Sequence, residues 1–108
     1  SMNHQDTAKP IRKLARIVGK PGHGDQLRAA LLELEAATRQ ELGCIEFSFF
    51  QAISDPDAFV LLEHFADEHA FKLHMTLEHT RSFFGTNAER VAGIKAVDIP
   101  SFESPVTR

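Results

Sequence analysis

The chain has 108 residues, of which 43% are hydrophobic and 25% charged, which is typical of one globular domain. Its net charge is −3 and its basic residues are scattered, which argues against a surface for nucleic acid or anionic membranes. No apolar run is long enough for a membrane span or a signal peptide, and the single cysteine cannot form an internal disulfide. We therefore expect a cytoplasmic protein.

The folded domain is expected over residues 9–100. Residues 1–8 are polar and are expected to be flexible, and Ser1 ahead of Met2 is typical of a residue left by tag cleavage. Residues 101–108 follow Pro100 and are expected to form an irregular tail.

The first half of the domain has a strand and a helix. Residues 11–18 contain β-branched residues in imperfect alternation and predict a strand. Residues 19–24 form a turn by their Gly and Pro content, and their spacing fits no phosphate-binding motif. Asp25 is expected to cap the helix that follows, and Gly43 to end it. The apolar stripe of this helix comprises Leu27, Ala30, Leu31, Leu34, Ala37 and Leu42.

The second half begins with a hairpin. Two β-rich runs, residues 44–51 and 58–65, flank a turn that is set by Pro and Asp residues. Asp67 is expected to cap the next helix. The order is then βαββααβ, an α+β arrangement. The last three elements are a helix over residues 68–76, a helix over residues 78–91 and a strand over residues 94–99.

The strand over residues 58–65 is apolar on both faces. Phe59 and Leu61 lie on one face, and Val60 and Leu62 lie on the other. Because helices can cover only one face of a sheet, we expect the sheet of a second copy to cover the other, in a homodimer. The alternatives are a monomer with an exposed apolar patch, or cover from the chain termini.

Several segments occur together in a characteristic order. They are residues 43–47 (GCIEF), Asp55-Pro56, residues 59–65 (FVLLEHF), residues 66–74 (ADEHAFKLH), and then His79 and Phe83. In this order and spacing the chain resembles the antibiotic biosynthesis monooxygenase family over roughly residues 11–99.

The resemblance implies a ferredoxin-like fold with an antiparallel sheet, sheets that pair into a dimeric α/β barrel, and a pocket between sheet and helices. Family members include cofactor-independent oxygenases of quinols and anthrones, haem-degrading enzymes and an isomerase-type enzyme, so the fold leaves the reaction open. Phe65 stands where many members have Trp, and the chain has no Tyr. This weakens the anthrone-oxidising and haem-degrading assignments.

Glu63 and His74 are the first two predicted catalytic residues. Glu63 lies on an otherwise apolar strand face, where burial would raise its pKa and make it a usable base. His74 shares the inward stripe of its helix with Ala70, Leu73 and Leu77, so helix packing can bring it within hydrogen-bond reach of Glu63. The alternative is a structural Glu–His pair that ties helix to sheet.

His79, at the junction of the two helices, is the third predicted catalytic residue, with a capping or surface role as the alternative. His64, His69, His74 and His79 recur every five residues, about 140° apart around a helix. Helical metal pairs use a spacing of four residues, so no metal site is expected. Cys44 is interpreted as a small buried hydrophobe and not as a nucleophile.

The leading hypothesis is a monooxygenase without a cofactor that oxidises a small aromatic quinol or anthrone-like substrate with dioxygen. His74, oriented by Glu63, would draw a proton from the substrate, and the resulting anion would pass an electron to dioxygen. The expected aromatic pocket comprises Phe47, Phe49, Phe59, Phe65, Phe71 and Phe83.

Two other functions stay open. The first is an isomerase or enolising enzyme for a small carbonyl compound or a phosphorylated signal molecule. The second is a protein that binds a small ligand without chemistry. A phosphate group would require converging cations, for which the candidates are Arg12, Arg16, Arg81 and Arg90.

Overall fold

The computed structural model describes residues 9–100, so the predicted flexible start and irregular tail lie outside the described residues. The element order is βαββααβ, as predicted. None of the helices in residues 9–100 has the length and hydropathy of a membrane span. The elements are β1 (Ile11–Gly19), α1 (Gly24–Thr38), β2 (Cys44–Gln51), β3 (Ala58–Phe65), α2 (Glu68–Thr76), α3 (Glu78–Asn87) and β4 (Val91–Asp98).

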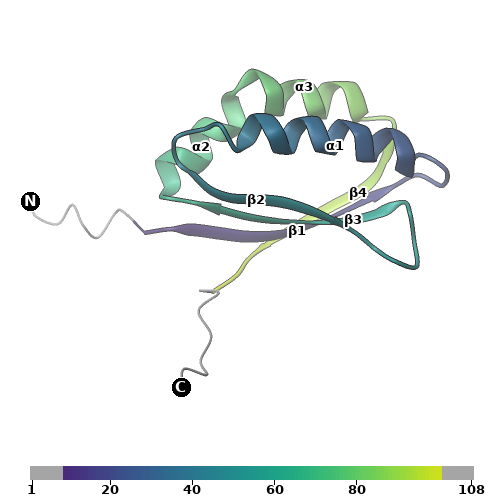
Figure 1. Cartoon of the computed structure of the whole chain (residues 1–108), viewed down its shortest axis with the longest axis horizontal. Coiled ribbons are helices and arrows are strands. Elements are labelled where there is room, and N and C mark those ends of the chain that lie inside the picture. Colours follow the sequence, from purple (N-terminus) through teal and green to yellow (C-terminus); the bar gives the residue numbers. More distant parts are fainter. Residues whose placement is uncertain (1–8, 101–108) are drawn as a thin grey trace, which may run out of the picture.

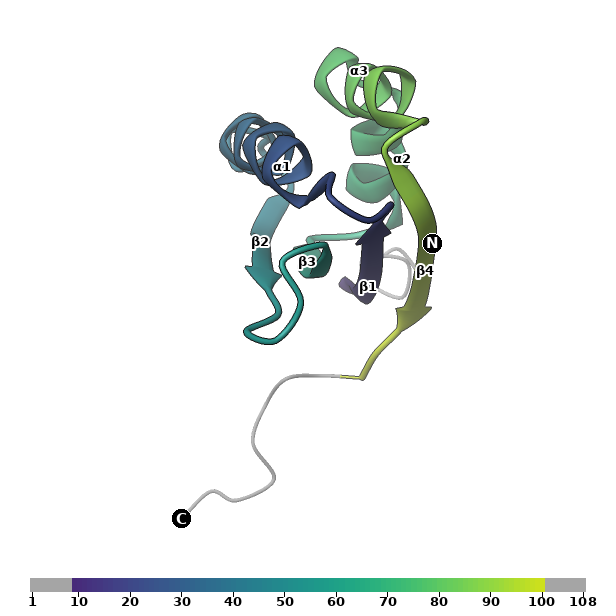
Figure 2. The same cartoon turned by 90° about the vertical axis from the view of Figure 1, so that its right-hand side faces the viewer.

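The four strands form one antiparallel sheet in the order β2-β3-β1-β4. All three helices lie on one face of this sheet, and within residues 9–100 no helix or strand lies on the other face (Figure 1, Figure 2). The predicted ferredoxin-like α+β fold is confirmed. The core is therefore a single layer between sheet and helices, and any site that needs enclosure must lie there.

The side chains of β3 alternate as the sequence predicts. Phe59, Leu61 and Phe65 are buried beneath the helices, and so is Glu63. Val60, Leu62 and His64 lie on the open face and are partly exposed. The buried apolar cluster comprises Ala15, Ile17, Leu27, Leu31, Leu34, Phe47, Phe59, Leu61, Phe65 and Phe83.

The cap of α1 comes from the hairpin turn and not from Asp25. The two carboxylate oxygens of Asp57 accept hydrogen bonds from the backbone N–H of Gly24 (2.8 Å) and of Gly22 (3.1 Å). A Cβ atom on Gly24 would collide with the backbone oxygen of Pro56, so the helix start sits directly on the turn. The prediction failed because a local reading of the sequence cannot see a cap supplied from 33 residues away.

The end of α1 also differs from the prediction. The helix stops at Thr38, so Leu42 does not belong to its buried stripe and is fully exposed. Gly43 has another role, because a Cβ atom there would collide with the Cβ of Ala70 in α2. The absence of a side chain lets the segment between α1 and β2 pass directly against α2.

Two further features differ. β2 has its predicted bounds but carries an irregularity at its start, where pairing shifts between Cys44 and Glu46 and leaves Ile45 exposed. The last predicted helix, expected over residues 78–91, ends at Asn87, and β4 begins at Val91, which pairs with Gly19 of β1. Pairing with β1 lets β4 begin before residue 94, where the sequence pattern predicted its start.

Candidate active site

Three polar side chains meet where α2, α3 and the segment after α1 come together. Nδ1 of His74 lies 2.9 Å from Oε2 of Glu41, and Nε2 of His79 lies 2.5 Å from the same oxygen. The hydroxyl of Thr80 lies 3.3 Å from Nδ1 of His74. The carboxylate of Glu41 therefore accepts a hydrogen bond from each imidazole, which fixes both rings.

His74 and His79 come together because the chain is not helical between them. Asp67 caps α2 as predicted, accepting a hydrogen bond from the backbone N–H of Ala70 at 2.8 Å. Leu77 then adopts extended backbone angles (φ −74°, ψ 154°) and separates α2 from α3. The five-residue spacing therefore crosses a break, and the helical-wheel argument that placed the two histidines on different faces does not apply.

Among the residues of α2, His74 is the one that is buried. Only 3% of its surface is exposed, which confirms that it points inward. Leu73, which was predicted to share that stripe, is 48% exposed. α2 is only nine residues long and packs mainly through its His74 side, so a full helical stripe does not form.

Glu41 is held by the backbone of the segment that carries it. Its N–H donates to the carbonyl oxygen of Thr38 (3.0 Å), and its own carbonyl oxygen accepts from the N–H of Cys44 (3.1 Å). The carbonyl oxygen of Gly43 accepts from the N–H of Ala66 (2.8 Å), which joins this segment to the end of β3. Glu41 is not among the predicted site residues, because a glutamate in the last turn of a predicted helix carries no local signal of burial.

Aromatic rings enclose His74. The centroid of its ring lies 5.2 Å from that of Phe47 and 5.0 Å from that of Phe65. Phe71 packs edge-on against Phe65 at 5.8 Å, and Phe49 packs edge-on against Phe47 at 5.4 Å. Four of the six predicted pocket phenylalanines thus form one connected cluster around the imidazole.

The other two phenylalanines lie elsewhere. Phe59 is six residues from Phe65 along β3, roughly 20 Å at the rise of a strand, and it packs at the opposite end of the core. Phe83 is buried on α3 and packs edge-on against Phe84 at 5.5 Å. A single pocket lined by all six rings, as the sequence suggested, is therefore wrong.

The surroundings of His74 favour its neutral form. Burial lowers its pKa from the ordinary value, and this effect exceeds the opposing effect of the hydrogen bond to Glu41. Neutral imidazole that donates through Nδ1 has its lone pair on Nε2. The ring is therefore an acceptor for a proton at neutral pH.

Glu63 lies on the helix-covered face of β3, between its strand partners Phe47 of β2 and Lys13 of β1. It is 6% exposed, and burial raises the pKa of its carboxyl to about 7, against the opposing effect of Lys13. Lys13 is itself paired with Asp98 at 2.6 Å. A carboxyl in this state is close to half-protonated at neutral pH.

The predicted pairing of Glu63 with His74 is wrong. Among residues 9–100, the carboxylate that hydrogen-bonds His74 is Glu41. Glu63 influences the cluster through charge alone, since the nearby carboxylate of Glu41 contributes to its raised pKa. The site therefore holds two carboxyl groups with different surroundings. Glu41 is hydrogen-bonded to two imidazoles, and Glu63 is buried on the helix-covered face of β3.

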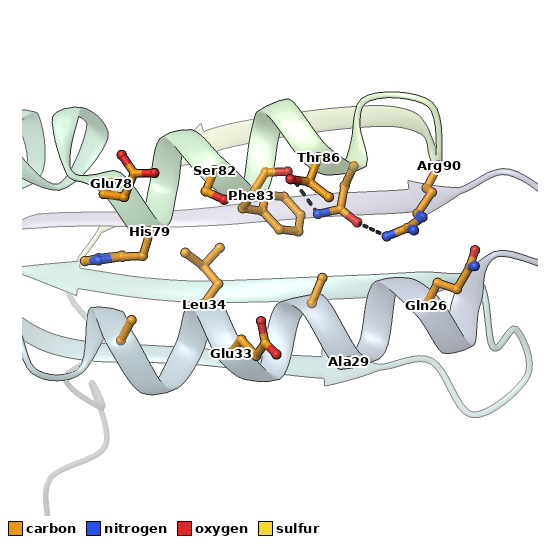
Figure 3. A pocket seen from close by; sticks show the side chains of 13 residues that line it. Gln26, Ala29, Glu33, Leu34, Glu78, His79, Ser82, Phe83, Thr86 and Arg90 are labelled. Carbon is orange, nitrogen blue, oxygen red and sulfur yellow. Dashed lines mark hydrogen bonds between the residues drawn. The ribbon is translucent and has the colours of Figure 1, made fainter.

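A groove lies between α1 and α3 and borders the cluster at His79. His79 lies at one end of this groove and Arg90 at the other, with Leu34 and Phe83 between them (Figure 3). The groove has a volume of about 670 Å³, enough for a small organic molecule. Its remaining lining residues are Gln26, Ala29, Ala30, Glu33, Ala37, Glu78, Ser82, Thr86 and Asn87.

Cys44 and the remaining predicted histidines lie outside this cluster. The pKa of the Cys44 thiol is raised to about 11, mainly by burial, so it is protonated at neutral pH, as expected of a packing residue. His69 is exposed on α2. His64 is partly exposed on the open face of the sheet.

Comparison with known proteins identifies relatives of this arrangement. The family model described as antibiotic biosynthesis monooxygenase matches residues 10–86, most of the chain. No match was found among curated proteins. Many solved structures match, and their similarity extends over nearly all of the described domain.

Three of these structures illustrate the similarity. PA3566 from Pseudomonas aeruginosa is 27% identical with a TM-score of 0.84, covering 90% of this chain and 98% of its own. Protein SO0527 from Shewanella oneidensis is 27% identical with a TM-score of 0.79, covering 85% and 90%. A third structure, described as an antibiotic biosynthesis monooxygenase, is 26% identical with a TM-score of 0.78, covering 86% and 99%.

Proposed function

Since the chain belongs to the antibiotic biosynthesis monooxygenase family, we propose that it is a cofactor-independent monooxygenase for a small aromatic quinol or anthrone-like substrate. The observation that supports this most directly is a buried, neutral imidazole that is fixed by a carboxylate and surrounded by phenylalanine rings. Such a site favours a flat apolar substrate with one acidic hydroxyl or C–H group.

The first step is removal of a proton. His74 donates through Nδ1 to Glu41 and accepts the substrate proton at Nε2, and the imidazolium that forms is stabilised by the carboxylate. In this proposal Glu41 is the positioning residue that the sequence hypothesis assigned to Glu63. His79 holds the second hydrogen bond to the same oxygen and keeps the carboxylate in place.

The second step is oxidation of the substrate anion by dioxygen. The anion gives electrons to dioxygen, one oxygen atom forms a bond to substrate carbon, and the other leaves as water. The substrate loses four electrons in total, so the reaction balances without another reductant. Glu63, with a pKa of about 7, can supply a proton to the departing oxygen and take one up again between turnovers.

The test is oxygen uptake with a panel of quinols that includes menadiol, with His74→Ala as the diagnostic variant. We expect wild-type uptake to fall roughly 10²–10⁴-fold in this variant, which is the usual contribution of a general base. His69→Ala, an exposed histidine on the same helix, is the matched control and should retain wild-type uptake. Unchanged uptake in folded His74→Ala would remove His74 from the mechanism.

A phosphorylated substrate, as the isomerase alternative would require, is less well supported by the described residues. Arg12 and Arg16 lie on the open face of the sheet, because their strand neighbours Ala15 and Ile17 are buried beneath the helices. Arg81 and Arg90 belong to the helical side. The four arginines therefore do not converge. A small-ligand binding protein remains the second alternative, and it predicts ligand binding without oxygen uptake.

We also propose that the protein is a homodimer formed through the open face of the sheet. Leu14 of β1 and Val97 of β4 are directly paired and are 38% and 51% exposed on this face. Val60 and Leu62 of β3 extend the apolar surface beside them. No helix of the described chain covers it (Figure 2), and family resemblance implies that a partner's sheet does.

A further inference from the structure

We propose that Glu41, His74 and His79 also form a binding site for one divalent first-row transition-metal ion, with zinc as the reference ion. Oε2 of the glutamate, Nδ1 of His74 and Nε2 of His79 all lie within 4.8 Å of one another. Two imidazole nitrogens and one carboxylate oxygen are a donor set that binds such ions in proteins. This inference goes beyond the proposed oxidation of a quinol.

The distances are close to those that a bound ion requires. Ligand atoms about 2.1 Å from a tetrahedral ion lie roughly 3.4 Å apart. The two Glu41 distances are 2.9 and 2.5 Å, so the carboxylate oxygen must withdraw by less than about 1 Å from each ring. His79 stands in the first turn of α3 with 27% of its side chain exposed, and its ring can move without disturbing the core.

The charge of Glu41 favours a cation at this place. Only 8% of its side chain is exposed, and burial of a carboxylate is costly unless its charge is compensated. Within residues 9–100, no lysine or arginine forms an ion pair with it, and its carboxylate is bonded to the two imidazoles. A divalent ion would compensate this charge directly and would bind the same three atoms, with the proton of each imidazole moving to the other ring nitrogen.

The surroundings provide both rigidity and access. His74 is fixed between the rings of Phe47 and Phe65, so one ligand is already placed. His79 borders the groove between α1 and α3, which gives an ion a path from solvent and room for water at the remaining coordination positions (Figure 3). Three protein ligands with an open position are typical of a metal site that is not purely structural.

The test uses the full chain after dialysis against a chelator. Calorimetric titration with ZnCl₂ is expected to give one ion per chain, and Co²⁺ is expected to give the visible absorption of a low-coordinate nitrogen and oxygen site. Glu41→Gln and His79→Ala should each weaken Zn²⁺ binding by at least about 100-fold, because loss of a direct ligand exceeds the usual 10- to 100-fold effect of an outer-shell partner. Melting followed by circular dichroism confirms that both variants are folded.

His69→Ala is the matched control, since His69 is an exposed histidine on α2 outside the cluster, and it should bind Zn²⁺ as the wild type does. Absence of Zn²⁺ binding, or equal binding by His79→Ala, overturns the proposal. The assay contains neither quinol nor an oxygen readout. Metal binding without oxygen uptake would keep this site and remove the proposed function, and oxygen uptake by a chain that binds no metal would do the reverse.

Discussion

Nδ1 of His74 lies 2.9 Å from a carboxylate oxygen of Glu41, a residue 33 positions earlier in the chain. This contact joins α2 to the segment that leaves α1, and it places the buried imidazole in one tautomer. It also assigns different roles to two glutamates, since Glu41 is hydrogen-bonded to the ring and Glu63 is buried without a hydrogen bond to it.

Glu41→Gln tests whether the carboxylate positions the imidazole. We expect kcat for quinol oxidation to fall roughly 10- to 100-fold with little change in KM, because the amide cannot stabilise the imidazolium. Steady-state oxygen uptake measures both constants. Glu68→Gln, an exposed glutamate paired with Lys72, is the control and should leave both constants unchanged. A rise in KM alone would indicate that Glu41 contributes to binding instead.

Glu63→Gln tests the buried carboxyl through the pH dependence of stability. The folded pKa is about 7 against an ordinary value of 4.5, so the folded chain binds this proton more tightly than the unfolded chain does. The free energy of unfolding therefore falls as pH rises from about 4.5 to about 7, by up to roughly 3 kcal/mol. The glutamine variant lacks this loss.

Urea denaturation at several pH values between 4.5 and 8 measures the effect as the difference between wild type and Glu63→Gln. The free energy of unfolding of Glu63→Gln should increase relative to that of the wild type as pH rises. The same comparison with Glu68→Gln, whose side chain is 65% exposed, should give a nearly constant difference. Parallel curves for wild type and Glu63→Gln would show that this carboxyl has the same pKa in the folded and unfolded chains, which would contradict the effect of burial.

Gly43→Ala tests how closely the segment carrying Glu41 must approach α2. The added methyl group would collide with the Cβ of Ala70, so the segment must move outward and carry the carboxylate with it. We expect lower stability by about 1–3 kcal/mol and reduced oxygen uptake. Gly85→Ala, where nothing lies within 4 Å of the added atom, should be neutral or slightly stabilising. Wild-type stability in Gly43→Ala would contradict the close packing.

Asp57→Ala tests the cap that the hairpin turn supplies to α1. Loss of the hydrogen bonds to Gly22 and Gly24 should lower the free energy of unfolding by about 1–2 kcal/mol. Chemical denaturation measures this change. Asp25→Ala, at the position that the sequence favoured as the cap, should cost less than 1 kcal/mol because only a favourable charge in the first turn is lost. A larger loss of stability in Asp25→Ala than in Asp57→Ala would show that Asp25 is the cap of α1.

Leu62→Glu tests the proposed dimer. Leu62 lies on the open face of the sheet, and a charge there would be buried against the partner's sheet at high cost. Light scattering after gel filtration should show a dimer for the wild type and a monomer for the variant. Leu32→Glu, an exposed leucine on α1 away from that face, is the control and should remain dimeric. A monomeric wild type would remove the dimer from the architecture.

The sequence by itself determined the element order, the inward face of β3 and the burial of Glu63 and His74. These depend on hydrophobic periodicity, which reports which side of an element faces the core. Tertiary structure alone decided that Glu41 and not Glu63 bonds His74, that Asp57 caps α1, and that His79 joins the cluster across the break at Leu77. Each of these joins residues that are distant along the chain or separated by a change of backbone direction, and periodicity carries no information about such contacts.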